Sequence, residues 1–180
     1  MRLDLAAFAA SAGELSGVCS GHELPRWADS QSPPQDTPAD EVPWRASGER
    51  RAVAAGDPEL WLHLTAQTQA WLTCQRCLQP YRHRLSIDRR LRFVRDEAQA
   101  ETLDAETEDD VLALPRWLDL HQLIEDELLL ALPLVPRHPR CPEPLPMAAP
   151  VDSDPAEAAR PNPFALLQRL KSGQGGAGTQ

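Results

Sequence analysis

Residues 71–81 read WLTCQRCLQPY, a Cys-x-x-Cys turn flanked by two long segments of alternating hydropathy. Upstream, apolar side chains fall on the even positions from Leu60 to Leu72, and the odd positions mix polar residues with two tryptophans. Downstream, the alternation continues at Leu85, Ile87, Leu91 and Phe93. A period of two is typical of a strand with one buried face. The stretch therefore predicts an antiparallel hairpin with Cys74 and Cys77 at its tip.

The clearest helix follows this hairpin. Residues 119–132 read DLHQLIEDELLLAL, in which Asp119 is the expected N-cap, Gln122 completes a capping box and Pro133 ends the helix. Its apolar positions recur at helical spacing: Leu120, Leu123, Ile124, Leu128 and Ala131. We therefore expect one face of this helix to pack on the sheet.

Weaker patterns complete the fold. A helix is expected at residues 4–12, a strand at 14–19, a helical turn at 24–28 and a further strand at 44–54. Gly56-Asp57-Pro58 favours a turn that would let the last of these strands pair with the hairpin. The sequence thus predicts an α+β fold. In it, a small antiparallel sheet, a meander built on the hairpin, is packed by one main helix, with short terminal helices and proline-rich loops.

The patterned segments form one predicted domain over residues 1–140. Within it, residues 29–43 hold four prolines and favour a loop. Residues 96–110 hold eight acids and no base, and we expect them to be a mobile, solvated segment. Three segments are expected beyond this domain: a proline-rich linker at 141–162, a short C-terminal helix at 163–171 and a disordered tail at 172–180.

Composition limits the classes of function. The net charge of −9 over 180 residues argues against a general nucleic-acid coat, because phosphate binding depends on an excess of Lys and Arg. No run of eighteen apolar residues occurs, and the start of the chain does not read as a secretion signal. We therefore expect a cytoplasmic protein without membrane partners. Four cysteines in a reducing compartment are more typical of thiols or metal ligands than of disulfides.

Two chelating pairs predict a candidate metal site. Cys74 and Cys77 have the spacing that lets two thiolates on one turn bind a single tetrahedral zinc. His138 and Cys141 supply a second pair after the main helix. Together the four residues resemble a structural zinc site, and the alternative is that the thiols are metal-free. Redox use is disfavoured, because a thioredoxin-type pair opens a helix, whereas Pro80 and a strand follow here.

A basic strand is the candidate working surface. Residues 76–95 contain seven arginines and a single acid. Four of the arginines share the outward face of the hairpin: Arg82, Arg84, Arg90 and Arg92. Arg89 falls on the inward side, where we expect it at an edge or paired with an acid. Arginine forks suit RNA phosphates, and Tyr81, His83 and Trp71 could stack on bases. The alternative, which stays open here, is that the arginines pair with the acidic segment of the same chain.

Three consecutive acids lie on the main helix: Glu125, Asp126 and Glu127. Because consecutive helical residues point about 100° apart, these side chains do not converge on one catalytic or metal site. We expect a solvated helix face, which could bind a protein partner. No nucleophile elbow, phosphate-binding glycine loop or HExxH motif occurs, so we expect a protein that is not an enzyme.

Three segments together resemble a known family: CQRCLQPY (74–81), DLHQLIEDELLLALPLVPRHPRC (119–141) and PNPFALLQRLK (161–171). They are similar to the bacterial YceD family, the large ribosomal RNA subunit accumulation proteins. The resemblance implies a role in the synthesis, processing or stability of the 23S ribosomal RNA, with no established catalytic activity. It places the family's motif positions at Cys74, Cys77, Glu125, Asp126, Glu127, Pro133, Pro136, His138, Cys141, Asn162, Pro163 and Phe164.

Three hypotheses about function follow from the residues and the resemblance. The first is accumulation of large-subunit rRNA through binding of precursor RNA or of an early large-subunit assembly intermediate. The alternative is a protein-interaction adaptor, whose acidic faces would recruit a basic ribosomal protein or an RNA-processing enzyme. The third is a zinc or thiol redox protein, which needs an activated cysteine that the turn is not expected to supply.

Overall fold

The structure is a computed structural model that describes residues 1–38, 40–53 and 57–142. Strands and helices alternate irregularly along this part of the chain. Their bounds are β1 Arg2–Leu3, α1 Leu5–Ala10, β2 Glu14–Cys19, α2 Pro25–Asp29, β3 Val42–Arg51, β4 Glu59–Thr73, β5 Pro80–Val94, α3 Glu97–Glu106, β6 Asp110–Ala113, β7 Leu118–Asp119 and α4 Leu120–Leu130.

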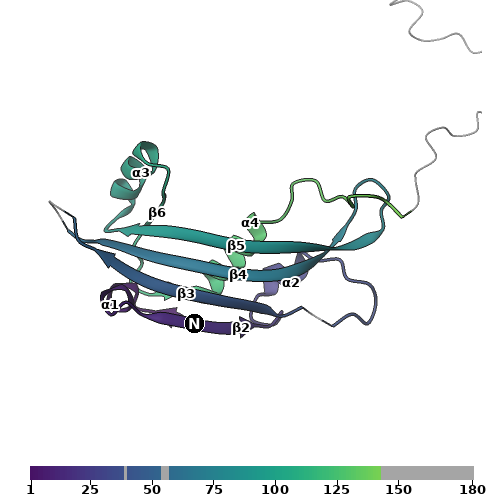
Figure 1. Cartoon of the computed structure of the whole chain (residues 1–180), viewed down its shortest axis with the longest axis horizontal. Helices are drawn as coiled ribbons and strands as arrows, with labels where there is room; N and C mark the ends of the chain where they lie inside the picture. The colour runs from purple at the N-terminus through teal and green to yellow at the C-terminus, as the bar shows by residue number, and fades with distance from the viewer. Residues whose placement is uncertain (39, 54–56, 143–180) are drawn as a thin grey trace, which may run out of the picture. The chain divides into compact units, whose positions relative to one another are not determined.

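Five of the strands form one sheet in the order β2-β3-β4-β5-β6 (Figure 1). The first four are antiparallel neighbours, whereas β6 runs parallel to β5. The long β4–β5 hairpin is the centre of the sheet, with Leu62 opposite Leu91 and Ala66 opposite Ile87. This register confirms that the even positions of β4 and the odd apolar positions of β5 share one face.

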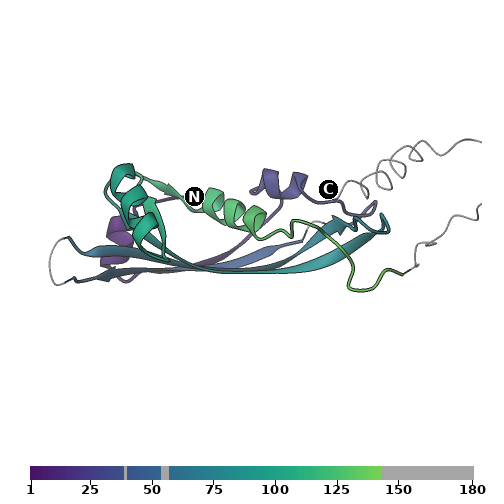
Figure 2. The ribbon, with the colours of Figure 1, turned by 90° about the horizontal axis from the view of Figure 1, so that it is seen from above.

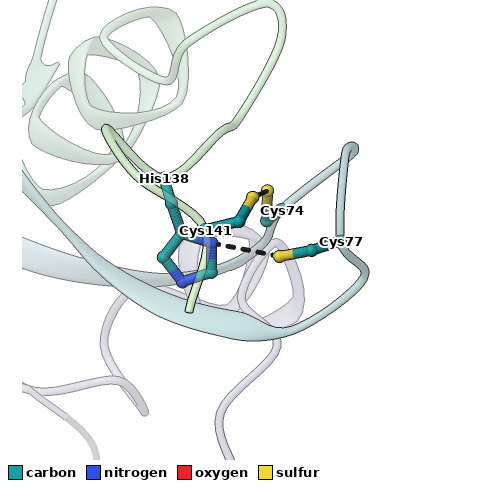
Figure 3. Close-up of side chains that lie close together, drawn as sticks. All are labelled: Cys74, Cys77, His138 and Cys141. Atoms are coloured by element: carbon teal, nitrogen blue, oxygen red, sulfur yellow. Dashed lines mark hydrogen bonds between the residues drawn. The ribbon is translucent and has the colours of Figure 1, made fainter. Parts of the chain in front are cut away.

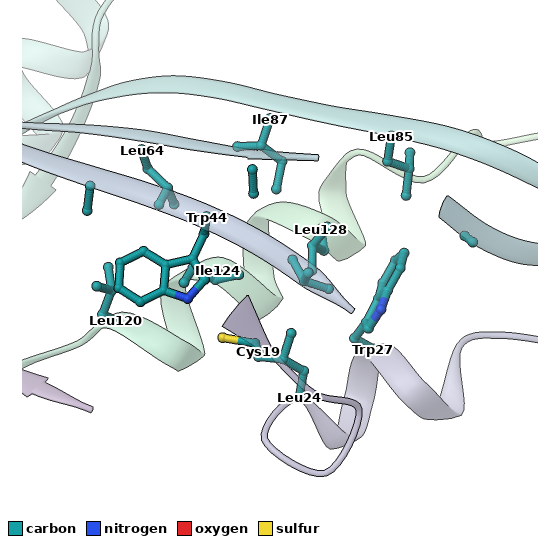
Figure 4. Packing of buried hydrophobic residues seen from close by; sticks show 14 of the residues in the cluster. Cys19, Leu24, Trp27, Trp44, Leu64, Leu85, Ile87, Leu120, Ile124 and Leu128 are labelled. Carbon is teal, nitrogen blue, oxygen red and sulfur yellow. The ribbon is translucent and has the colours of Figure 1, made fainter. Parts of the chain in front are cut away.

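The core lies between this face and the helices. Figure 2 shows the helices on one side of the sheet, and none of the described helices covers the other side, which we call the open face. α4 contributes Leu120, Ile124 and Leu128, each 0% exposed, and they pack in one cluster with Leu64 and Ile87 (Figure 4). The α+β class and the single main helix are therefore as predicted.

The main helix begins where its sequence indicates. The Asp119 carboxylate accepts hydrogen bonds from the backbone N–H groups of His121 and Gln122, which satisfies two of the free donors at the start of α4. Leu123 and Ala131 lie at the margin of the packed face and are partly buried. The apolar stripe of α4 is thus narrower than the predicted face, with Leu120, Ile124 and Leu128 at its centre.

The sheet is larger than the predicted meander. The predicted strand at 14–19 joins it as β2, at the edge next to β3. β6 joins it at the opposite edge, after α3 has carried the chain back over the end of β5. A four-residue strand carries too little pattern to be predicted, and a parallel neighbour requires a crossover connection that the sequence did not indicate.

The acidic segment 96–110 differs from the expectation of a mobile, solvated segment. It forms a helix, α3, in which Asp96 accepts a hydrogen bond from the backbone N–H of Gln99. Ala100 is buried in a small second cluster at the β5–β6 end of the sheet. An N-cap and the apolar contacts of Ala100 and of the partly buried Leu103 hold α3 in place, while its acids face solvent.

Some expectations fall outside the described residues. These are residues 143–162 of the predicted linker, the helix at 163–171, the tail at 172–180 and Gly56 of the predicted turn. Within the described ranges, none of the helices has the length and apolar character that a membrane crossing requires.

Candidate functional site

The hairpin tip brings two cysteines to one end of the sheet. The backbone N–H of Cys74, directly after β4, donates to the carbonyl of Gln79 at 3.0 Å. The N–H of Leu78 donates to the carbonyl of Cys74 at 2.8 Å, and Leu78 adopts a φ of 60° that closes the turn. Cys77 lies within this turn, so both thiols belong to one hydrogen-bonded loop.

The segment after α4 reaches the same place. Pro133 and Pro136 prevent a continuing helix and favour extended backbone. The carbonyl of Pro136 accepts a hydrogen bond from the backbone N–H of Gln75 at 2.9 Å. This contact ties the segment to the hairpin tip and brings His138 and Cys141 beside the turn.

Four candidate ligands converge at this point (Figure 3). Their ligand atoms all lie within 4.8 Å of one another: those of Cys74, Cys77, His138 and Cys141. The Sγ atoms of Cys74 and Cys141 are 3.8 Å apart. The Sγ atom of Cys77 is 3.3 Å from Nδ1 of His138. Two thiolates held ~2.3 Å from one tetrahedral zinc lie ~3.8 Å apart, so this spacing fits a zinc ion.

The surroundings of Cys74 favour the thiolate form of its side chain. Burial by itself raises the pKa of the Cys74 thiol, but hydrogen bonds, chiefly from the backbone N–H groups of His138 and Cys77, outweigh it and lower the pKa to about 5. At Cys77, burial is the largest cause and raises the pKa. The Nε atom of Arg76 donates to Sγ of Cys141 at 3.0 Å. A thiolate is the form that binds metals, and Cys74 is 0% exposed, which hinders its use in thiol exchange.

Two of the three predicted stacking rings face away from the open face. Tyr81 is buried, with its ring centroid 4.8 Å from that of His138, and burial is the main cause that raises the pKa of its hydroxyl. His83 is opposite Ala70, on the helix-facing side of the hairpin. Trp71 keeps an outward position. Tyr81 therefore supports the cysteine–histidine cluster and is not available to bases.

Two of the four outward arginines form ion pairs. Arg82 pairs with Asp40, and its guanidinium lies over the ring of Trp71 at 5.5 Å from the centroid. Arg92 pairs with Glu59 at 2.8 Å, and its side chain is 17% exposed. These contacts reduce the charge that Arg82 and Arg92 present to a ligand.

The other two outward arginines are exposed. Neither Arg84 nor Arg90 forms an ion pair with a residue that the structure describes. β3 adds a third such arginine, Arg45. It lies on the open face in one row with Thr65 of β4 and Asp88 of β5. Sequence reasoning missed Arg45, because the weak alternation of β3 did not show which residues lie beside the hairpin.

Arg89 faces inward, as predicted. Its guanidinium pairs with Glu127 at 3.1 Å and with Asp110 at 3.4 Å. Asp110 belongs to the acidic segment, so pairing between that segment and the basic strand does occur. Among the described residues it involves Arg89 and none of the four outward arginines.

The acidic triplet of α4 is not the solvated face that we predicted. Glu125 is 5% exposed and accepts hydrogen bonds from the backbone N–H groups of Arg26 at 2.7 Å and Trp27 at 3.1 Å. The Arg26 guanidinium pairs with Glu125 and also with Asp126 at 2.7 Å. Glu127 is 9% exposed and holds Arg89. Arginines from α2 and β5 satisfy these carboxylates, and no local pattern in α4 could have revealed such distant partners.

Comparison with known proteins places this geometry in a family. The family model described as large ribosomal RNA subunit accumulation protein YceD matches residues 62–171. The chain belongs to the YceD family. A protein of Haemophilus influenzae, named large ribosomal RNA subunit accumulation protein YceD, is 39% identical over 103 residues. The match covers 56% of this chain and 59% of that relative. No solved structure matches the chain.

The YceD match includes some of the features described above and leaves others out. It includes the four candidate ligands, the arginines of β5 and the acidic triplet of α4. It excludes β2 and β3, and therefore Arg45. The motif positions Asn162, Pro163 and Phe164 lie within the match but outside the described residues.

Proposed function

We propose that this member of the YceD family is a non-catalytic ribosome biogenesis factor of the cytoplasm. It would support the accumulation of 23S rRNA by binding precursor RNA or an early large-subunit assembly intermediate. The name of the Haemophilus influenzae relative supports a role in the accumulation of large-subunit rRNA. The single observation that carries direct RNA contact is the open face of the sheet, where Arg45, Arg84 and Arg90 are exposed and form no ion pair with a described residue.

Local charge outweighs net charge on this face. The protein as a whole carries −9, but most of the acids near the arginines are already engaged. Asp40 pairs with Arg82 and Glu59 pairs with Arg92. The remaining guanidinium groups can form forked hydrogen bonds to phosphate oxygens, and they would add the salt-dependent part of RNA affinity.

The cysteine–histidine cluster is proposed to hold a structural zinc ion. Four protein ligands close the coordination sphere, and such closed sites are structural, whereas catalytic sites leave one position to water. The ion would clamp the segment after α4 to the hairpin tip. It would thereby fix the end of β4 and β5 that carries Trp71 and Arg82, next to the open face.

The RNA proposal is tested in a strain depleted of the native protein. The variant Arg84→Glu/Arg90→Glu should leave the fold intact, because both side chains are exposed, and should fail to restore 23S rRNA levels. A charge-matched control, Arg50→Glu/Arg116→Glu, changes two exposed arginines away from the open face and should restore them. Normal rRNA levels with a folded Arg84→Glu/Arg90→Glu variant would contradict direct RNA binding by these arginines.

A second candidate function rests on α3. This helix exposes four acids and no base: Glu97, Glu101, Asp104 and Glu106. Such a surface favours a basic ribosomal protein or a processing enzyme as partner. The triplet at 125–127 no longer favours an adaptor, since Glu125 and Glu127 are buried. Replacing the four α3 acids with glutamine should impair rRNA accumulation if the adaptor function is correct, and should have little effect if the protein binds RNA directly.

A further inference from the structure

A hollow of about 570 Å³ lies on the open face, where the chain leading into β3 passes the outer halves of β4 and β5. Its lining includes Gln67 and Gln69 of β4 and Arg84 and Ser86 of β5. The chain leading into β3 adds Glu41 and Asp40, and Asp40 is paired with Arg82. Its volume falls within the range of about 300–1,000 Å³ that small-molecule sites occupy. It therefore has room for one planar ring system.

The strand register explains why these four side chains lie together. Gln67 is opposite Ser86, and Gln69 is opposite Arg84. Directly opposite residues of an antiparallel pair have Cβ atoms about 5 Å apart. Since positions two apart share a face, the two pairs form adjacent rows, and the row of Trp71 and Arg82 comes next.

The amide and guanidinium groups of the hollow are complementary to the edge of a nucleotide base. A glutamine amide offers a donor and an acceptor side by side, and an arginine fork offers two donors. These are the groups that pair with adenine and guanine edges. The side chains of Gln67, Gln69 and Arg84 form no hydrogen bond with another described residue. Their hydrogen-bonding capacity is thus available to a ligand.

We propose that this hollow binds an unpaired purine base of single-stranded RNA. The inference rests on the proposed RNA-binding function and adds which form of RNA is bound and where. Gln67 and Gln69 would hydrogen-bond the base edge, and Arg84 would reach the base or its phosphate. A base inside a duplex does not fit, because the major groove of A-form RNA is too deep and narrow for side chains to read.

The rest of the open face extends the track. Arg90 is six residues beyond Arg84 on β5, a distance of roughly 20 Å at about 3.3 Å per residue. Arg45 lies in the row between them that contains Thr65 and Asp88. Arg45 and Arg90 would hold phosphates farther along the same RNA strand. The exposed groups along this track are mainly guanidinium, amide and hydroxyl groups, and the carboxylate of Asp88 is paired with His63 at 2.7 Å. The centres of protein–protein interfaces, in contrast, are depleted of charge.

The test compares base discrimination between variants. Fluorescence anisotropy measures the binding of A12 and U12 single-stranded RNA and of a twelve-base-pair RNA duplex to the whole protein at fixed salt. The wild type should bind A12 more tightly than U12 and the duplex.

The variant Gln67→Ala/Gln69→Ala should lose about tenfold or more of its affinity for A12, the loss expected for a good base contact. The slope of log K against log salt should stay unchanged, because no phosphate contact is removed. Gln122→Ala, on α4, is the matched control and should bind like the wild type.

The outcomes separate this inference from the function on which it rests. If the glutamine variant binds A12 as tightly as the wild type, or if the wild type binds duplex and single strand equally, the base site is wrong. Loss of RNA binding by Arg84→Glu/Arg90→Glu would then still support the RNA-binding function. If the wild type binds none of the three RNAs, both the base site and direct RNA binding are wrong.

Discussion

Cys74 and Cys141 are 67 positions apart in the sequence, yet their sulfur atoms lie 3.8 Å apart. The contact joins the tip of the β4–β5 hairpin to the segment that follows α4. It therefore holds the segment after α4 against the end of the sheet that carries the hairpin tip. The same spacing is that of two thiolates on one zinc ion.

The first prediction concerns metal content. Purified protein should contain one zinc per chain by elemental analysis. Cys77→Ser should weaken zinc binding by more than about a hundredfold, a larger loss than the 10–100-fold typical of changes around the ligands, and should lower the melting temperature. Gln79→Ala, on the same turn, should keep both. Full-length protein without zinc, at wild-type stability, would contradict the structural zinc site.

The second prediction concerns the buried carboxylate of α4. Glu125→Ala should lower the free energy of unfolding by about 2–3 kcal/mol, because it removes charged hydrogen bonds to two backbone N–H groups and a guanidinium. Asp126→Ala should cost less than about 1 kcal/mol, because Asp126 is 41% exposed and shares Arg26 with Glu125. Urea unfolding measures both values. Equal losses of unfolding free energy in the two variants would mean that the burial of Glu125 does not add to stability.

The third prediction concerns the packed face of α4. Leu128→Ala should lower the free energy of unfolding by about 2–5 kcal/mol, since Leu128 is completely buried between helix and sheet. Leu130→Ala, at a site that is 72% exposed, should change it by less than about 0.5 kcal/mol. A small loss at Leu128 would show that another face of α4 packs on the sheet.

The fourth prediction concerns pH. A hydrogen bond with the N-terminal ammonium is the largest cause that lowers the pKa of Asp119, and the N–H groups of Gln122 and His121 add to it. A lowered pKa in the folded state means that the stabilisation is complete above the unfolded value, about 3.9, and is lost as pH falls through the folded value. Asp119→Ala should therefore cost about 1 kcal/mol at pH 7. The difference from wild type should shrink below about pH 4, and a difference that grows in acid would contradict this assignment.

The β4–β5 hairpin and α4 could be predicted because their periods are long and clear. The even positions from Leu60 to Leu72 specify a face without help from the rest of the chain, and the stripe from Leu120 to Leu128 does the same for the helix. The two chelating pairs were also visible, because spacing within each pair is local. That the two pairs would lie together in space could be predicted only because a structural zinc site needs four ligands.

Features that depend on distant partners could not be predicted. The burial of Glu125 depends on Arg26, which is 99 positions away. Arg45 became part of the open face only through the register of β3 with β4. α3 was not predicted because its eight-acid segment has almost no apolar pattern: only Ala100, which is buried, and Leu103, which is partly buried, pack it against the end of the sheet.

The central claim is that the open face contacts large-subunit rRNA directly. The most direct test is ultraviolet cross-linking of the full-length protein in cells, with sequencing of the bound RNA and mass spectrometry of the cross-linked peptides. We expect 23S precursor RNA, joined to peptides from β4 and β5 that contain Trp71, Gln69 or Arg84. Absence of rRNA cross-links, or cross-links confined to peptides from α3 and α4, would contradict the claim.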